Sequence, residues 1–341
     1  GRPATRLQVV DRKRKVLDTL SQASSRPGRP LRTTLDMRIQ RAAQGVYATT
    51  GGAVVMDPRT GDLLAVVASS PFDPNNYVGV SGIEPFNRAL SGLYPPGSSL
   101  KVLTAAAALD TNEYKPSDQL TGPAEYKGVR NFESGVFGEL SFAEALQFSV
   151  NTAFAQIAEK LGPRKLMTYA GRFGFNREHE MALAAARSSF PLPKDEGDLL
   201  WGSIGQAQVL ATPLQMATLA AMIANGGKRM EPRIAKHDRP TGQRVVSKKT
   251  ARTMVGLMEN VVQGGTGVGA QISGVRVAGK TGTAEVDVGG QRLNHAWFIC
   301  FAPADDPKVA VAVVSEYGGV GGQVAAPIAR SILAAVLPFV R

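Results

Sequence analysis

Residues 94–101 read Tyr-Pro-Pro-Gly-Ser-Ser-Leu-Lys, and a mainly apolar run rich in alanine, 102–109, follows them. Two prolines and a glycine interrupt the chain, and the alanine-rich run favours a helix, so a helix is predicted to begin near Ser98. Lys101 then lies on the same helix face as Ser98, close enough for its amine to contact the hydroxyl. Desolvation can lower the pKa of a lysine enough for its amine to take the serine's proton. The stretch therefore suggests an acylatable serine.

The same stretch has a simpler interpretation. Ser98 or Ser99 could cap an ordinary helix while Lys101 lies in solvent, and for an isolated Ser-x-x-Lys this is the commoner outcome. If Ser98 lies in the first turn, the helix N-terminal amides favour negative charge that develops at its oxygen. The rest of the chain has to decide between the two interpretations.

Composition indicates one large globular domain with a subdomain, since the chain has 341 residues, 43% of them hydrophobic and 20% charged. The formal net charge is +11. Residues 1–33 hold nine Lys and Arg against two Asp, so +7 of it belongs to this segment and +4 to the remainder. The segment lacks interleaved aromatic residues and any nucleic-acid motif, so no nucleic-acid partner is expected. We interpret it as a linker or the remnant of a preceding domain.

Cysteine and histidine are too few for several kinds of site. Cys300 is the single cysteine, which excludes an internal disulfide, and it lies in an apolar run that indicates a core position. The histidines, His179, His237 and His295, have no metal-ligand spacing, so no metal is expected. No apolar run approaches the roughly 18 residues of a membrane span, so none is predicted within this sequence.

Apolar patterns at the two ends of the chain predict a sheet. Thr34-Leu35-Asp36 opens an amphipathic helix, and a turn at 57–62 separates two strands of a hairpin, 52–56 and 63–68. The C-terminal third has a helix at 251–262, strand-like runs at 275–286, 295–302 and 309–315, with a turn at 303–307 between the last two, and a closing helix at about 324–336. Residues 98–227 are mostly helical in pattern, with stretches at 142–147, 152–161 and 213–224.

This arrangement predicts an α+β fold. Two early and three late strands form a five-stranded, mainly antiparallel sheet flanked by helices, with an inserted all-helical subdomain. We expect residues 34–97 and about 228–341 to form the sheet part of one domain, 34–341, and residues 98–227 its mainly helical part.

Two further motifs carry polar chemistry. Ser149-Val150-Asn151 lies at the break between two helical runs, where a hydroxyl and an amide project from a loop, although an ordinary helix cap has the same composition. Lys280-Thr281-Gly282-Thr283 lies within the first late strand, and a glycine there suits close approach of another backbone. The strand could pair with an extended peptide while Lys280, Thr281 and Thr283 meet its terminal carboxylate. Alone, this motif is more often a strand-edge bend with a solvated lysine.

Taken together and in order, Ser-x-x-Lys, Ser-x-Asn and Lys-Thr-Gly resemble the signature of the penicillin-recognising serine acyl-transferases. From residue 34 to the C-terminus the sequence also resembles the transpeptidase domain of class B penicillin-binding proteins. The stretches that carry this resemblance are 34–36 with Gln40, 52–58, 94–98, 151–154, 205–206, 212–215, 224–227 and 279–285.

The resemblance implies a role for each motif residue. Ser98 would attack the carbonyl of a D-alanyl-D-alanine terminus with Lys101 as general base, and Ser149 would relay the proton to the leaving amine. Asn151 would hold the substrate amide, and the backbone N–H groups of Ser98 and Thr283 would form the oxyanion hole. The substrate-binding strand would comprise Lys280, Thr281, Gly282 and Thr283, with the three side chains on the terminal carboxylate. No cofactor is called for, and a β-lactam would acylate Ser98.

Other chemistries have weaker support. A Ser-His-Asp triad would need one of the three histidines, none of which the sequence marks, and His295 precedes a strand. A class A β-lactamase uses a Glu-x-x-Leu-Asn stretch, and Glu196 begins the nearest match but lacks the asparagine, so we interpret Glu196 as a solvated loop residue. Class D β-lactamases usually have Ser-x-Val where Asn151 stands, and β-lactam sensors more closely resemble class D enzymes, so Asn151 argues against both. A D,D-carboxypeptidase stays open.

We therefore expect the transpeptidase domain of a class B penicillin-binding protein. Its partners would be peptidoglycan stem peptides, β-lactams, and possible membrane-bound cell-wall machinery such as a glycosyltransferase. It would work on the extracytoplasmic face of the bacterial membrane, held by an N-terminal anchor outside this sequence. The sequence does not distinguish cell division, elongation and sporulation.

Overall fold

Runs of small and β-branched residues form the central sheet of this protein, whose structure is a computed structural model that describes residues 2–26, 28, 30–69 and 86–340. The sheet has five strands in the order β11-β12-β13-β3-β4, all antiparallel. The strands are β3 (Gly51–Met56), β4 (Leu63–Ala68), β11 (Ala278–Val288), β12 (Gln291–Ala302) and β13 (Val309–Ser315). Val54 pairs with Ala312, so strands from both ends of the chain meet, as the sequence predicts.

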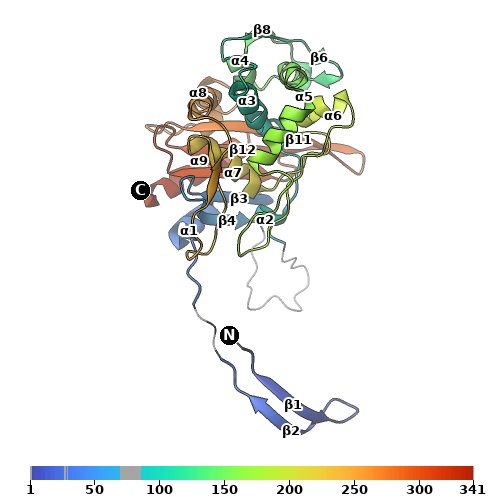
Figure 1. The fold of residues 1–341 in the computed structure, drawn as a ribbon, viewed down its shortest axis with the longest axis vertical. Coiled ribbons are helices and arrows are strands. Elements are labelled where there is room, and N and C mark those ends of the chain that lie inside the picture. Colours follow the sequence, from blue (N-terminus) through green and yellow to red (C-terminus); the bar gives the residue numbers. More distant parts are fainter. Residues whose placement is uncertain (1, 27, 29, 70–85, 341) are drawn as a thin grey trace.

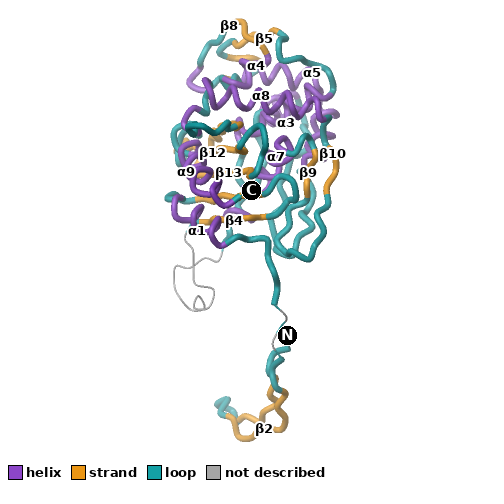
Figure 2. Tube along the Cα trace, turned by 90° about the vertical axis from the view of Figure 1, so that its left-hand side faces the viewer, coloured by secondary structure: helices purple, strands orange, loops and turns teal. Residues whose placement is uncertain are grey.

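Helices cover both faces of this sheet (Figure 2). Alternate residues of a strand point to opposite faces, so Val54 and Val55 belong to different hydrophobic clusters. The Val55 face packs against α1 (Met37–Val46) and α9 (Ala325–Val336), and the Val54 face against α7 (Pro213–Ala224). Helix α7, which the sequence assigned to the helical block, therefore covers the sheet.

The remaining helices form a layer above the sheet edge (Figure 1). They are α3 (Lys101–Asp110), α4 (Phe142–Gln147), α5 (Asn151–Phe173), α6 (Glu196–Ser203) and α8 (Lys248–Gly264). Residues 101–108 of α3 are all buried, which identifies α3 as the central helix of this layer. The layer is mainly helical, but it also holds four short strands that the sequence did not indicate: β5 (Gln119–Gly122), β6 (Glu125–Tyr126), β7 (Val129–Arg130) and β8 (Gly138–Ser141).

Smaller elements complete the described chain. They are α2 (Arg88–Ser91), β9 (Lys228–Met230), β10 (Gly242–Arg244), and the 3-10 turns η1 (Gly97–Leu100), η2 (Phe132–Ser134), η3 (Val268–Ala270) and η4 (Leu337–Phe339). In the described part of the chain, no helix is both long enough and apolar enough to cross a membrane.

The N-terminal residues form a hairpin of β1 (Thr5–Val10) and β2 (Val16–Ala23), which lies apart from the sheet (Figure 1). No hydrogen bond or ion pair joins described residues 2–26 to the rest of the described chain. The domain itself is joined from Arg32 onward, where the Arg32 carbonyl accepts from Lys236 N at 2.9 Å.

Three local predictions need correction. The predicted helix 152–161 continues to Phe173, because the chain kinks at Gly162-Pro163 and then resumes helical geometry. Strand β12 begins at Gln291, so His295 lies within it and does not precede it. Glu196 is not a loop residue: it opens α6, where Asp195 caps the helix.

Candidate active site

Ser98 and Ser99 lie in the 3-10 turn η1, one turn before the α-helix that the sequence predicts to begin there. Ser99 is fully buried, and its hydroxyl donates to the Pro96 carbonyl at 2.6 Å. Ser98 is partly exposed, and its hydroxyl has no hydrogen-bond partner among the described residues. Of the two serines, Ser98 is thus the one open to attack an incoming carbonyl.

Three separate segments hold this serine turn in place. Gly97 N donates to the Gly205 carbonyl at 2.9 Å, and the Trp297 indole donates to the Pro95 carbonyl at 2.9 Å. Tyr94 and Ala211 exchange two backbone bonds of 3.1 and 2.8 Å. Gly97 has φ +53°, and a Cβ there would lie 2.7 Å from the Thr283 carbonyl oxygen. The turn therefore needs a glycine to pass this close to β11.

Lys101 is fully buried behind the turn, and its amine faces the break between α4 and α5. Nζ donates to the Ser149 carbonyl and to Asn151 Oδ1, each at 2.6 Å, and lies 3.3 Å from Ser149 Oγ. Burial and then the charge of Lys280 hold the pKa of Lys101 well below its usual range. A neutral amine has two N–H groups, which these two carbonyl oxygens satisfy, and its lone pair is left to take a proton.

Ser149 lies between the two buried lysines. It has φ +60°, a left-handed conformation that is uncommon for serine and that places it between α4 and α5. Its hydroxyl accepts from Lys280 Nζ at 2.8 Å and lies 3.3 Å from Lys101 Nζ. This hydroxyl can therefore receive a proton on one side and release one on the other.

Strand β11 brings the third motif to the same place. Lys280 is fully buried, and burial lowers its pKa to about 7. Its amine also donates to the Thr281 carbonyl at 3.1 Å and to Thr281 Oγ1 at 3.3 Å. In the described chain no carboxylate forms an ion pair with Lys101 or Lys280, so the site keeps unneutralised positive charge for an anionic ligand.

Close packing joins β11 to the serine turn. A Cβ at Gly282 would lie 2.7 Å from the Pro96 carbonyl oxygen and 3.1 Å from Ser99 N, so a side chain would force the two apart. The backbones of Ser98 and Thr283 are thereby held next to each other. Strand β11 is also at the edge of the sheet, which leaves its outer side for an extended peptide.

The structure thus brings the sequence-predicted residues together at one place, between η1, the α4–α5 break and β11. A continuous set of hydrogen bonds connects Lys101, Asn151, Ser149, Lys280 and Thr281. Ser98 is adjacent through the η1 turn, but no hydrogen bond joins its hydroxyl to Lys101 in this structure. Ser98 and Lys101 still share a face, because residues i and i+3 of a 3-10 turn lie above one another.

A family model for the penicillin binding protein transpeptidase domain matches residues 51–334. The chain belongs to this family.

Curated relatives of this transpeptidase domain are named peptidoglycan D,D-transpeptidases. This chain is 37% identical to the peptidoglycan D,D-transpeptidase PbpA of Mycobacterium tuberculosis over 354 residues, which cover 89% of this chain and 72% of the relative. It is 31% identical to the peptidoglycan D,D-transpeptidase FtsI of Escherichia coli, over 99% of this chain and 61% of that protein.

Solved structures of the family agree in fold. The ceftriaxone acyl-enzyme complex of penicillin-binding protein A from Mycobacterium tuberculosis has a TM-score of 0.83 and 35% identity, and the match covers 90% of this chain and 80% of that one. The transpeptidase domain of Burkholderia pseudomallei penicillin-binding protein 3 has a TM-score of 0.78 and 28% identity, with 92% and 97% covered. The α+β fold predicted from the sequence is therefore confirmed.

Two residues near the site of this transpeptidase domain were not predicted from the sequence. Thr266 follows α8, and its hydroxyl bonds Thr281 Oγ1 at 2.7 Å. Asn131 is 5% exposed and bonds Thr152, the neighbour of Asn151. The turn composition of 264–267, Gly-Gly-Thr-Gly, predicts a loop but not where it packs.

The residues named for competing chemistries lie elsewhere. Glu196 is exposed and pairs with Lys127 at 2.6 Å. His237 is exposed. His179 is half-buried, and its two ring nitrogens are buried without a hydrogen-bond partner among the described residues. Burial lowers the pKa of His179 to about 4. His295 accepts from Tyr317 N at 3.1 Å. None of these four contacts Ser98 among the described residues.

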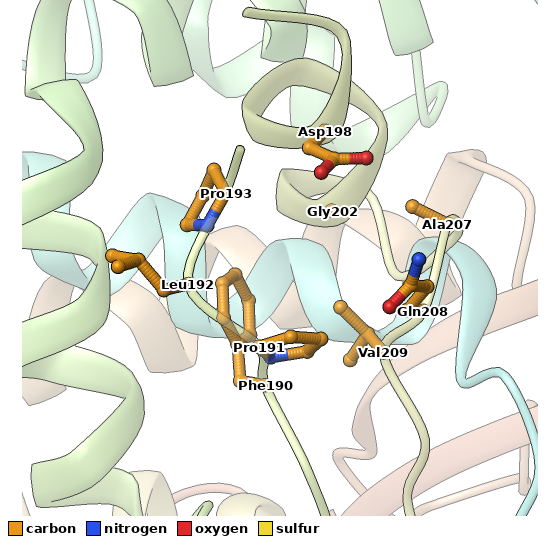
Figure 3. Close-up of a pocket in the computed structure, with 9 residues that line it drawn as sticks. All are labelled: Phe190, Pro191, Leu192, Pro193, Asp198, Gly202, Ala207, Gln208 and Val209. Atoms are coloured by element: carbon orange, nitrogen blue, oxygen red, sulfur yellow. The ribbon is translucent and has the colours of Figure 1, made fainter. Parts of the chain in front are cut away.

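A separate hollow beside α6 has no part in this chemistry (Figure 3). It encloses about 20 Å³, room for about one water molecule. Its walls are Phe190, Pro191, Leu192, Pro193, Asp198, Gly202, Ala207, Gln208 and Val209. No motif residue lines it, so it is not the substrate cleft.

Proposed function

We propose that this transpeptidase domain cross-links peptidoglycan through an acyl-enzyme on Ser98, and that it is acylated at the same serine by β-lactams. The observation that carries this proposal is the placement of Lys101: it is buried, it has no carboxylate partner among the described residues, and both N–H groups of its neutral form are satisfied by carbonyl oxygens. Its lone pair is thus available to a hydroxyl.

In the first step Lys101 Nζ takes the Ser98 proton as the Ser98 oxygen bonds to the carbonyl carbon of the penultimate D-alanine. The carbonyl π electrons move to its oxygen, which the N–H groups of Ser98 and Thr283 stabilise by about 3 kcal/mol for each donor. When the oxyanion collapses, the C–N bond breaks and Ser149 gives its proton to the leaving D-alanine amine. Ser149 recovers a proton from Lys101, to which it is adjacent.

Binding of the substrate uses the groups on either side. Lys280, Thr281 and Thr283 receive the terminal carboxylate, since Lys280 is the cation next to two hydroxyls and has no carboxylate partner in the described chain. Because Gly282 has no side chain, the serine turn packs directly against β11, the strand with which the substrate peptide pairs. Asn151 holds the substrate amide with the N–H of Nδ2 that its bond to the Arg130 carbonyl leaves over.

A peptide amine as acceptor completes transpeptidation, and water in its place would make the domain a D,D-carboxypeptidase. A serine β-lactamase needs a base that activates water at the acyl-enzyme, and Glu196 is engaged with Lys127. A β-lactam sensor would be acylated without turnover.

We place the domain on the extracytoplasmic face of the bacterial membrane, with an N-terminal anchor and membrane-bound cell-wall enzymes such as a glycosyltransferase as partners.

The test is incubation with penicillin G, intact-mass measurement over several hours and peptide mapping, with Ser98→Ala and Ser99→Ala as a matched pair. We expect a stable adduct on Ser98 that persists in Ser99→Ala and is absent in Ser98→Ala. Peptidoglycan donor and acceptor peptides would then give a cross-linked product.

Rapid loss of the adduct with drug hydrolysis would instead identify a β-lactamase. Acylation without any turnover of peptide donors would identify a sensor. If the folded protein formed no adduct, Ser98 would not be the nucleophile.

A further inference from the structure

The loop 123–135 closes against the N-terminus of α5, next to Asn151. Its central contact is Asn131, whose side chain is 5% exposed. Nδ2 donates to the carbonyls of Pro123 and Gly135, both at 2.8 Å, and Oδ1 accepts from Thr152 N at 3.1 Å. One amide thus ties both ends of the loop to the helix that carries Asn151.

The residue before Asn131 contacts the site through its backbone alone. The Arg130 carbonyl accepts from Asn151 Nδ2 at 2.8 Å, whereas the Arg130 guanidinium points to solvent and pairs with Glu125 at 2.7 Å. A carbonyl oxygen can only accept a hydrogen bond. It therefore requires the Nδ2 side of the Asn151 amide, which leaves Oδ1 to accept from Lys101 at 2.6 Å.

The loop conformation needs such a restraint. Glu133 and Ser134, two and three residues after Asn131, have φ of +52° and +57°, which non-glycine residues adopt at an energetic cost. The Ser134 amide donates to the Asn131 carbonyl at 3.0 Å, so the backbone of Asn131 also closes this turn. The pairing of β7 with β6 also restrains Arg130, and the Asn131 side chain joins this hairpin to the N-terminus of α5.

We propose that Asn131 is a positioning residue for acylation, which fixes the Arg130 carbonyl and through it the orientation of the Asn151 amide toward Lys101. If the amide turned over, Nδ2 would face the Lys101 amine, and two donors would meet. This inference rests on the proposed function, since it assigns Asn131 to the same acylation of Ser98.

The test is a double-mutant cycle of Asn131→Ala and Asn151→Ala, with the second-order rate of acylation by penicillin G as the readout. We expect Asn131→Ala to slow acylation by about 10-fold, the value of about one well-placed hydrogen bond. In the Asn151→Ala background the same change should alter the rate by less than about 2-fold, because its effect passes through Asn151. Arg130→Ala keeps the carbonyl and serves as the matched control, with an unchanged rate.

A second variant and a spectroscopic readout keep the test decisive if the Asn131→Ala protein does not fold. Thr152→Val removes the hydroxyl that bonds Pro123 O at 2.9 Å and lies 3.1 Å from Asn131 Nδ2, and it should slow acylation a few-fold in the same direction. The side-chain amide protons of Asn151, followed by NMR hydrogen exchange, should be protected in the unmodified chain and in Arg130→Ala and exchange faster in Asn131→Ala and Thr152→Val.

Equal slowing by Asn131→Ala in both backgrounds, an unchanged rate in Asn131→Ala, or unchanged exchange of the Asn151 amide would each overturn the role of Asn131. If the unmodified chain were not acylated at all, the proposed function would fail instead, and the exchange measurement would still decide whether Asn131 orients Asn151.

Discussion

At the scale of single residues, two fully buried lysines share one site. Lys101 and Lys280 both bond to Ser149, and no carboxylate partner balances either of them in the described chain. Two neighbouring ammonium groups in a desolvated site disfavour each other, so protonation of one lysine opposes protonation of the other. Burial lowers the pKa of Lys280 to about 7, and burial together with the charge of Lys280 holds the pKa of Lys101 well below its usual range. The proposed role of Lys101 as the base assigns it the neutral form.

This sharing predicts a bell-shaped pH dependence for acylation by penicillin G. The rate should fall at low pH, where Lys101 becomes protonated and loses its capacity as a base. It should also fall as the pH rises above about 7, where Lys280 loses the charge that attracts the ligand carboxylate. The measurement is kcat/KM, or the second-order acylation rate, against pH.

A β-lactam whose carboxylate is replaced by a carboxamide is the control. It does not need the Lys280 charge, so its rate should keep the acid limb and lose the alkaline one. An alkaline limb that is unchanged with the carboxamide would contradict the assignment of Lys280.

The same burial predicts that Lys280→Met stabilises the fold. An ammonium whose pKa falls from 10.5 to about 7 costs the folded state on the order of 4 kcal/mol at pH 7 and below. Between about pH 7 and 10.5 the unfolded chain binds more protons than the folded one, so this cost shrinks as the pH rises. Since the bonds to Ser149 and Thr281 are lost as well, we expect a net gain of about 2 kcal/mol at pH 6.

Urea unfolding at pH 6 and pH 10 measures this gain, which should be smaller at pH 10. Lys249→Met, on an exposed position of α8, is the control and should show no such pH dependence. A Lys280→Met protein that is less stable than the parent at pH 6 would contradict the prediction. Acylation by penicillin G should be lost in either case.

At the scale of elements, the site depends on how closely η1 approaches β11. A Cβ at Gly282 would meet Pro96 O at 2.7 Å and Trp297 Cβ at 2.9 Å, so Gly282→Ala must move the serine turn away from the strand. Because a displacement of about 1 Å costs about 100-fold in rate, acylation of Ser98 should fall by about that factor.

Gly256→Ala is the matched control. Gly256 lies inside α8 with nothing within 4 Å of a new Cβ, so alanine should leave acylation unchanged and stabilise the helix by up to about 1 kcal/mol. If Gly282→Ala were acylated as fast as Gly256→Ala, the close approach of η1 and β11 would not matter for the chemistry.

The elements also show what the sequence can predict. Four of them, α4, α7, β4 and β13, begin and end at the predicted residues, because apolar periodicity and turn residues mark their ends. Strands of two to four residues, such as β6 and β7, are too short to show a period, so they were missed.

The candidate site divides in the same way. Its motif residues were predicted because nucleophile, base and carboxylate-binding groups are recognised by residue type and spacing. Asn131 and Thr266 were not predicted, because the role of an asparagine or a threonine in a loop depends on which residues pack against it in the fold. The direction of the Lys101 amine, toward Ser149 and Asn151, likewise depends on the positive φ of Ser149.

At the scale of the whole molecule, the N-terminal hairpin is separable from the domain. We expect deletion of residues 1–30 to leave acylation unchanged and the melting temperature within about 2 °C, since no hydrogen bond or ion pair joins described residues 2–26 to the domain.

A deletion through residue 34 is the comparison. It removes Thr34, whose buried hydroxyl donates to Leu63 O at 2.7 Å, and should lower the free energy of unfolding by about 1–3 kcal/mol. Calorimetry of both deletions measures the difference. Equal melting temperatures for the two would place the start of the domain later than Thr34.

The pairing of β3 with β13 also sets an order for biosynthesis. Val54 finds its partner Ala312 only after residues 55–312 have been made, and at about 5–20 residues per second that takes tens of seconds. Until then the edge of β3 that later pairs with β13 has unpaired backbone groups, which can pair with another nascent chain. A message that stops before residue 309 would encode every motif residue of the site, and its product would have no strand on which to close the sheet.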